Sequence, residues 1–295
     1  MKLPNVNNLP KLGSLWMLVA ALGFATMGAL VKVGAAKFNT AELVFYRSIF
    51  GLMAIYMVMR MKGLPVKTPV FATQMSRAIA GYLSLILYFY AIAHLPLATA
   101  ITLNNTSGLF LAGLMPFFLH EKPKKTLVIA LFLGFIGVVL LLQPSLNRQN
   151  MLAGLVGLVS GFGAAIAYTS IKKLAVLNEP DWRTVFYFTL VSTLGSGIWM
   201  LFQTFTPILW QDLPVLVGLG VSATIAQLAL TRAYRTGKTL TVASLAYVTV
   251  IIASFFGVLF WQEHLSLAEW LGIGLIILSG VISIKTTSEN ASTTK

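Results

Sequence analysis

Two stretches of 30 residues decide the fold, because the second repeats the first: "AHLPLATAITLNNTSGLFLAGLMPFFLHEK" (93–122) and "RTGKTLTVASLAYVTVIIASFFGVLFWQEH" (235–264). They align without a gap at an offset of 142, which places Thr99 over Thr241 and Phe118 over Phe260. Both stretches reach a glutamate near their ends, at Glu121 in the first. The chain is therefore an internal duplication.

The duplication extends over the rest of each half. "VFYRS" (44–48) lies over "VFYFT" (185–189) at an offset of 141, and residues 23–32 lie over 163–172 at an offset of 140. Each half carries five apolar runs, and an odd number makes the second copy enter the membrane from the opposite side. The sequence thus predicts an all-α integral membrane protein with ten transmembrane helices as an inverted 5+5 repeat, an architecture typical of alternating-access carriers.

The composition agrees with a membrane location. Of 295 residues, 57% are hydrophobic and 10% are charged, and the mean hydropathy is +0.84; soluble domains carry about 25% charged residues. A transmembrane helix needs about 20 mostly apolar residues. The candidate runs are 14–34, 42–60, 76–94, 96–119, 126–143, 152–172, 183–205, 213–234, 239–262 and 267–285. They are too long and too uniformly apolar for the strands of a transmembrane barrel.

The charges predict how the chain is oriented. We expect repeats at 14–143 and 152–285, with short cytoplasmic tails at 1–13 and 286–295. With the N-terminus inside, 17 of the 21 Lys and Arg residues lie on the inner side, which fits the positive-inside rule. This predicts a multi-pass protein of the inner (plasma) membrane with both termini cytoplasmic. The net charge of +13 is then explained by orientation and by contact with anionic lipid heads, so the expected partner is the lipid bilayer and not nucleic acid.

The two blocks ending near glutamate, "FFLHEKPKK" (117–125) and "LFWQEHLSLAEWLGIGLIILSGV" (259–281), resemble the two halves of an EamA-type transporter of the drug/metabolite transporter superfamily. The resemblance covers about 14–285. It implies ten helices, cytoplasmic termini and a central cavity. It also implies that the protein exports or takes up small metabolites. The family often has a proline in the middle of helices 4 and 9, where this chain has Gly108 and Val250. Gly108 could permit a bend, but Val250 is expected to keep its helix straight.

Polar side chains inside a membrane helix are candidates for the binding site. On a helical wheel Thr102 and Asn105 share a face, and Asn104 lies on the other side. Hydroxyl groups can bond back to their own helix, but an amide has more donors and acceptors than the helix can satisfy. We therefore expect at least one of the two asparagines to face substrate and favour Asn105, with Asn104 as a further candidate. The predicted pocket has Asn105 and Thr102 on one wall and their counterparts Tyr247 and Ser244 on the other.

Further candidates are Gln227, Tyr82, Tyr168 and Arg47. Gln227 is a deep amide like the asparagines, whereas the two tyrosines could line the cavity or pack in the core. Arg47 could extend its side chain outward to the membrane surface, or it could recognise a carboxylate or phosphate of the substrate. Arg77 lies nearer a helix end and is expected to reach the surface.

Several classes of function are disfavoured by what the sequence lacks. The eight acidic residues all lie in loops, tails or helix ends, whereas small multidrug resistance proteins, which resemble half of this architecture, carry a carboxylate in the first helix. No P-loop, catalytic motif or metal-ligand cluster is present, so we expect no enzyme activity, no cofactor and no metal. The prediction is an exporter of a small neutral, zwitterionic or anionic metabolite, either amino-acid-like or nucleobase-like. A proton-coupled exporter of cationic drugs, a membrane-embedded enzyme and a non-transporting scaffold remain alternatives. The protein could be a monomer or a homodimer.

Overall fold

The computed structural model describes residues 10–95, 97–118, 124–142, 151–261 and 266–292, and every regular element in these ranges is helical. Glu121 and Glu263, which mark the ends of the repeated blocks, lie outside the described residues. The helices of the first half are α1 Pro10–Gly34, α2 Thr40–Met61, α3 Phe71–His94, α4 Leu97–Asn105, α5 Ser107–Phe118 and α6 Lys125–Leu142. Those of the second half are α7 Met151–Val176, α8 Asp181–Met200, the 3₁₀ turn η3 Trp210–Asp212, α9 Leu213–Thr236, α10 Thr239–Ala246, α11 Val248–Trp261 and α12 Leu267–Ser292.

Among the described residues, six segments are long and apolar enough to cross a membrane: Gly13–Gly34, Thr40–Met61, Phe71–His94, Met151–Val176, Trp210–Thr236 and Thr239–Phe260. Helices satisfy their own backbone hydrogen bonds, as hydrocarbon requires. Large apolar side chains are exposed around the bundle, such as Phe132 on α6 and Ile277 on α12. Such a surface suits a lipid solvent, and the chain is a multi-pass membrane protein.

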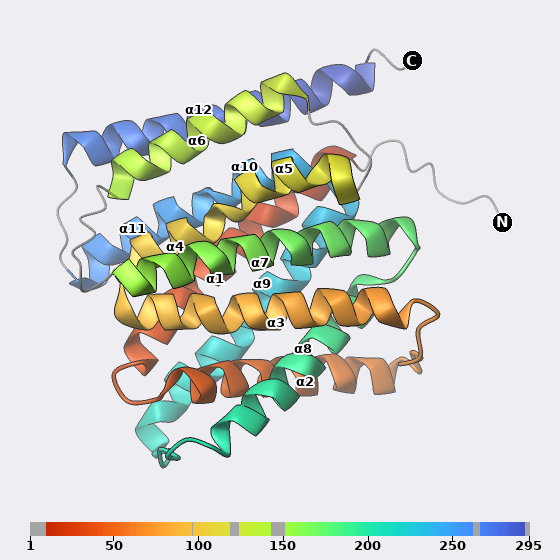
Figure 1. The fold of residues 1–295 in the computed structure, drawn as a ribbon, viewed down its shortest axis with the longest axis vertical. Helices are drawn as coiled ribbons and strands as arrows, with labels where there is room; N and C mark the ends of the chain where they lie inside the picture. Colours follow the sequence, from red (N-terminus) through yellow and green to blue (C-terminus); the bar gives the residue numbers. More distant parts are fainter. Residues whose placement is uncertain (1–9, 96, 119–123, 143–150, 262–265, 293–295) are drawn as a thin grey trace.

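The helices with the most extensive contacts pair one half of the chain with the other. α1 packs on α9, α3 on α7, α2 on α8 and α6 on α12. Figure 1 shows α6 and α12 together as one outer layer, α2 and α8 near the opposite edge, and the remaining helices between them. The interior is therefore built jointly by the two halves.

Equivalent small residues make equivalent contacts between the halves. Gly23 of α1 faces Ala226 of α9, where an added Cβ would lie 2.8 Å from the Ala226 Cβ. Gly163, the counterpart of Gly23, faces Ser84 of α3, where an added Cβ would lie 3.1 Å from the Ser84 Cβ. Ser84 and Ala226 are themselves counterparts at the offset of 142. Small residues at both positions let the helices approach closely, as in other membrane bundles.

Two helices are interrupted at nearly equivalent places. Thr106 separates α4 from α5, and Tyr247 separates α10 from α11. The backbone tightens there to i→i+3 bonds: the Leu109 amide donates to the Thr106 carbonyl at 2.9 Å, and the Val250 amide donates to the Tyr247 carbonyl at 2.9 Å. This tightening occurs without a proline at either place, and the straightness of the helix containing Val250 stays a prediction.

Equivalent lysines donate hydrogen bonds to backbone carbonyls at the two ends of the bundle. Lys32 near the end of α1 donates to the Leu95 carbonyl at 2.6 Å, between α3 and α4. Its counterpart Lys172 near the end of α7 donates to the Gly237 carbonyl at 3.2 Å, between α9 and α10. Leu95 and Gly237 are also counterparts at the offset of 142. The same contact is thus made once in each half.

Two buried carboxylates join the halves at opposite ends of α8. Glu42 caps the start of α2 in a capping box with Asn39, and it accepts hydrogen bonds from the Thr206 amide at 2.6 Å and hydroxyl at 3.0 Å, beyond the end of α8. Glu179, just before α8, accepts a bond from the Gln74 side chain of α3 at 2.9 Å. A contact between the first and the second half is therefore present at each end of α8.

Candidate substrate-binding site

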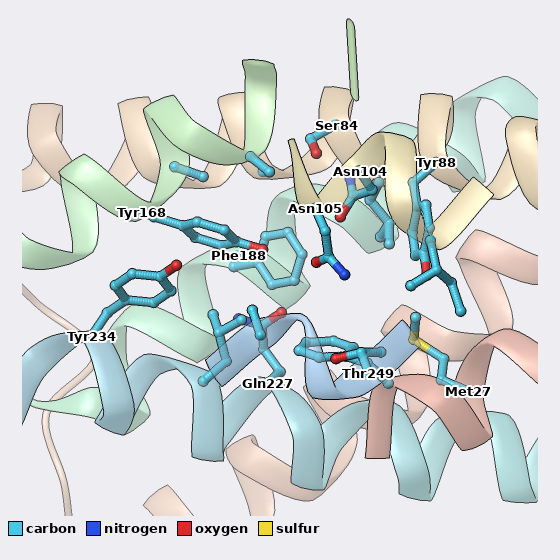
Figure 2. Close-up of a pocket in the computed structure, with 18 of the residues that line it drawn as sticks. Met27, Ser84, Tyr88, Asn104, Asn105, Tyr168, Phe188, Gln227, Tyr234 and Thr249 are labelled. Atoms are coloured by element: carbon cyan, nitrogen blue, oxygen red, sulfur yellow. The ribbon is translucent and has the colours of Figure 1, made fainter. Parts of the chain in front are cut away.

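A cavity lies at the junction of the two halves, and it receives side chains from α1, α2, α3 and α4 of the first half and from α7, α8, α9, α10 and α11 of the second. The space open to the centres of water molecules is about 80 Å³, enough for several waters, since one water needs about 10–15 Å³. In Figure 2, Tyr168 and Tyr234 lie at one end of this space, Met27 and Tyr88 at the other, and Asn105 points in between them.

The lining combines equivalent positions that carry different chemistry. Six pairs of counterparts both face the cavity: Phe24 and Ala164, Met27 and Ala167, Arg47 and Phe188, Leu85 and Gln227, Tyr88 and Leu230, and Asn104 and Ala246. In four of these pairs one member is polar or charged and the other is apolar. The duplication therefore brings several pairs of equivalent positions to the cavity with different chemistry, whereas other lining residues, such as Asn105, have counterparts outside it.

Arg47 points into the bundle and not outward to the membrane surface. Only 3% of its surface is exposed. Its Nη2 donates to Gln227 Oε1 at 3.3 Å, and its Cζ lies 5.1 Å from the centre of the Phe188 ring. Its Nε and Nη1 atoms are buried and have no hydrogen-bond partner among the described residues. A buried cation with unsatisfied donors is costly, and an anionic or carbonyl acceptor in the cavity would satisfy these donors.

Arg77 was expected to reach the membrane surface, and this expectation was wrong. It is 2% exposed, lines the cavity, and its Cζ lies 4.4 Å from the centre of the same Phe188 ring. The guanidinium folds back over Gly81, one turn further along α3, where an added Cβ would overlap Arg77 Nη1. The glycine at i+4 was the one signal in the sequence that could have located this arginine.

The predicted amides lie in the cavity. Asn104 and Asn105, the last two residues of α4, both line it, and so does Gln227 of α9. Asn104 Nδ2 donates to Ser160 Oγ of α7 at 3.0 Å, whereas Asn105 Nδ2 is buried and has no partner in the described part of the chain. Asn105 thus offers an unused donor, and Asn104 is partly occupied by helix packing.

Of the predicted aromatic residues, Tyr168 lines the cavity and Tyr82 does not. The Tyr168 ring stacks on Tyr234, with ring centres 4.6 Å apart. Tyr82 instead packs against Gly195 of α8. A wall of stacked phenols gives the cavity a flat apolar surface near its polar groups.

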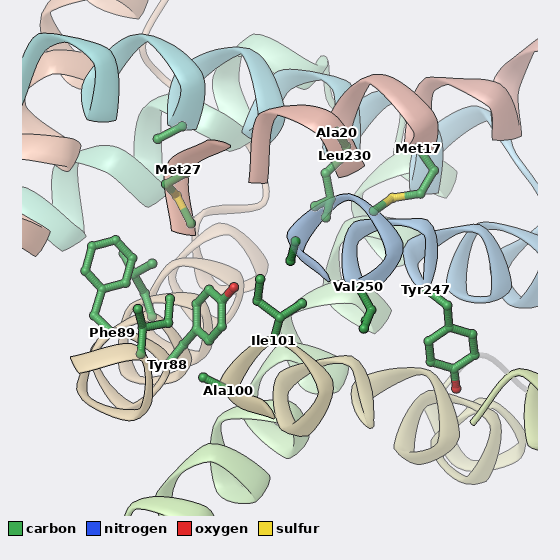
Figure 3. Close-up of a cluster of buried hydrophobic side chains, with 14 of the residues drawn as sticks. Met17, Ala20, Met27, Tyr88, Phe89, Ala100, Ile101, Leu230, Tyr247 and Val250 are labelled. Atoms are coloured by element: carbon green, nitrogen blue, oxygen red, sulfur yellow. The ribbon is translucent and has the colours of Figure 1, made fainter. Parts of the chain in front are cut away.

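The predicted wall of Tyr247 and Ser244 is not part of the cavity. Tyr247 is fully buried, donates to the Leu131 carbonyl of α6 at 3.4 Å and extends away from Met27 and Tyr88 (Figure 3). Ser244 donates back to the Leu240 carbonyl of its own helix at 3.0 Å. Thr102 is buried but does not line the cavity. These three side chains are held by helix packing, and a direct role in binding stays a prediction without support from this geometry.

The cavity is cationic as a whole. Two arginines line it, and no acidic side chain is among the described lining residues. In the same described ranges no group of three His, Asp or Glu side chains could hold a metal ion. The arrangement can therefore bind a small polar molecule through guanidinium, amide and phenol groups.

The comparisons agree with such an arrangement. The chain matches the EamA-like transporter family over residues 11–143 and again over 151–284. It is 31% identical over 284 residues to the pseudopaline exporter of Pseudomonas aeruginosa (strain UCBPP-PA14), covering 96% of this chain and 99% of that protein. It is 25% identical over 295 residues to a riboflavin transporter of Vibrio cholerae, covering 93% of each. A solved structure described only as "Crystal structure of protein" superimposes with a TM-score of 0.77 at 18% identity, over 93% of this chain and 96% of that one.

A multi-pass bundle in which each half matches a transporter family, with relatives named as transporters, identifies the chain as a small-molecule membrane transporter and not an enzyme. The chain belongs to the EamA-like transporter family, and it carries two copies of the family unit. The family resemblance of its paired blocks is thereby confirmed.

Proposed function

We propose that this protein exports a small amino-acid-like or nucleobase-like metabolite across the inner membrane by alternating access. The cargo would be neutral, zwitterionic or anionic. The observation that carries the proposal is the cavity at the junction of the halves, where Asn105 and Arg47 present buried donors without partners in the described residues. A substrate with acceptor oxygens would satisfy them.

The architecture we propose is ten spans in an inverted 5+5 repeat, with both termini cytoplasmic. In this orientation the Lys32 contact with Leu95 lies at the outer end and the Lys172 contact with Gly237 at the inner end. Alternating access requires each end to open in turn, and equivalent contacts at the two ends support such an exchange. The small cavity fits a state in which both ends are closed.

Export is supported by the relatives. The pseudopaline exporter is similar over 96% of this chain, and we extend the direction of its transport to this protein. The riboflavin transporter shows that this similarity group also includes proteins named for a different cargo. The cargo class is therefore argued from the cavity of this chain. Two lining arginines and no described lining acid disfavour a carrier of cationic drugs.

The test is a comparison of metabolites that accumulate in cells lacking the protein and in cells overproducing it. Metabolites whose external level rises with the amount of protein are then offered to proteoliposomes. We expect time-dependent movement of at least one of them. A protein that inserts correctly but moves none of these metabolites in liposomes would refute the proposal.

A further inference from the structure

We propose that Arg47 and Arg77 together form a site for two carboxylates of one substrate, so that the cavity prefers a dicarboxylate to a monocarboxylate. This inference rests on the proposed function, because it assumes that the cargo occupies this cavity. It deepens that proposal by naming the charge of the cargo.

The first argument is the number of charges. Arg47 and Arg77 come from neighbouring helices, both are almost fully buried, and both line the same cavity. In the described ranges neither makes an ion pair with a carboxylate. Two like charges brought together in an apolar region repel each other, and one monoanion would compensate only one of them. A dianion would compensate both.

The second argument is the number of unused donors. Arg47 and Arg77 each have a buried Nε and Nη1 atom with no hydrogen-bond partner within the described part of the chain. Both Cζ atoms lie over the Phe188 ring, and a ring stabilises a cation without accepting a conventional hydrogen bond. Each guanidinium can therefore receive one carboxylate, with the planar geometry that arginine and carboxylate share.

The third argument is the space made for Arg77. An added Cβ at Gly81 would overlap Arg77 Nη1 and would lie 3.0 Å from the Phe188 ring. Any other residue at Gly81 would thus displace the guanidinium from its place beside Phe188. The glycine, the ring and the arginine form one arrangement that holds the second charge in the cavity, where a surface-seeking arginine would not remain.

The experiment measures ligand affinity by thermal unfolding of the purified full-length protein in detergent, with succinate, butyrate and phosphate as probes at equal ionic strength. Succinate and butyrate have the same chain length and differ in the second carboxylate. We expect at least about tenfold tighter binding of succinate than of butyrate, which corresponds to about 1.4 kcal/mol. In Arg47→Gln and Arg77→Gln this preference should disappear. The control Arg232→Gln, at an exposed residue over Trp16, should keep it.

A second variant keeps both charges. Gly81→Ala should displace Arg77 and reduce the preference for succinate about tenfold, even if the arginine variants fail to fold. Equal affinity for succinate and butyrate in the unmodified protein would overturn the inference, and so would tighter binding of phosphate than of succinate. Proteoliposome flux separates the two proposals: flux of a metabolite without a succinate preference overturns only this inference, whereas a succinate preference without flux of any metabolite overturns the proposed function alone.

Discussion

The two halves of the chain are alike at the ends of the bundle and differ in the cavity. At the ends, counterparts make the same contact, as Lys32 with Leu95 and Lys172 with Gly237 do. In the cavity, counterparts differ, and Arg47 meets Phe188 where a symmetric protein would place two identical residues. This difference is what the proposed function requires: under alternating access each end opens and closes by an equivalent movement, whereas a small metabolite bound in the cavity is not symmetric.

The largest effect is expected where the symmetric contacts are closest. Gly23→Leu and Gly163→Leu would each force apart a helix pair between the halves, and overpacking costs about 1–3 kcal/mol or more. We expect both variants to lose similar stability, measured as the fraction folded in a denaturant titration. Gly113→Leu is the control, because no atom of the described residues lies within 4 Å of an added Cβ there. A loss of stability in only one of the two leucine variants would show that the halves do not pack equivalently.

The next effect is expected in the divergent cavity. Asn105→Leu removes a donor that has no partner among the described residues, so it should leave stability unchanged. It should lower flux in proteoliposomes about tenfold, because one good hydrogen bond to substrate is worth about 1.4 kcal/mol. Thr99→Val, on the same helix outside the cavity, should leave flux unchanged. Equal flux in both variants would remove Asn105 from the site.

A smaller effect is expected at the fastened ends. Lys32→Met removes the bonds to the Leu95 and Ile92 carbonyls, and Lys172→Met removes the bond to the Gly237 carbonyl. A loss of about 1 kcal/mol at one end should shift the balance between the open states about fivefold. The chain contains no cysteine, so Ala246→Cys places a single thiol in the cavity for a membrane-impermeant maleimide. In the proposed orientation, labelling from the outer side should rise in Lys32→Met, and labelling from the inner side should rise in Lys172→Met. Lys62→Met should change neither, and a shift of both lysine variants toward the same side would contradict the comparison.

The smallest effect is expected at Tyr247. Tyr247→Phe removes only the hydroxyl that donates to Leu131 at 3.4 Å, and we expect a loss of about 0.5 kcal/mol in stability with flux unchanged. Thermal unfolding and proteoliposome flux measure the two quantities. Reduced flux with unchanged stability would support the predicted role of Tyr247 in substrate binding.

The helices and the duplication could be read from the sequence because they follow from local composition and from self-similarity. The site was predicted in part. Asn105 and Gln227 line the cavity as expected, because deep polar groups in a membrane helix turn toward one another. Arg47, Tyr168 and Asn104 also line it, and for these the sequence had left another position open. Their role in binding stays a prediction.

The rest could not be predicted because it depends on how the helices pack against one another. A helical wheel shows which side chains share a face of one helix, but not which neighbouring helices that face meets. Tyr247 turns to α6, and both Asn104 and Asn105 reach the cavity. The position of the Arg77 side chain was predicted wrongly. Its distance from the helix end does not show that Gly81 leaves room for the side chain to fold inward.

The interruptions at Thr106 and Tyr247 also bear on the energy of opening. Bending a continuous helix breaks backbone bonds in hydrocarbon, where nothing replaces them. Here the Thr106 carbonyl already accepts from Leu109 at 2.9 Å and from Phe110 at 3.1 Å, and the Tyr247 carbonyl accepts from Val250 at 2.9 Å. An exchange between such i→i+3 and i→i+4 partners would let α5 turn relative to α4, and α11 relative to α10, while the backbone groups keep hydrogen-bond partners. The work of opening one side would then fall mainly on side-chain contacts at that side. Such a carrier would cycle without melting and rebuilding its helices at each turnover.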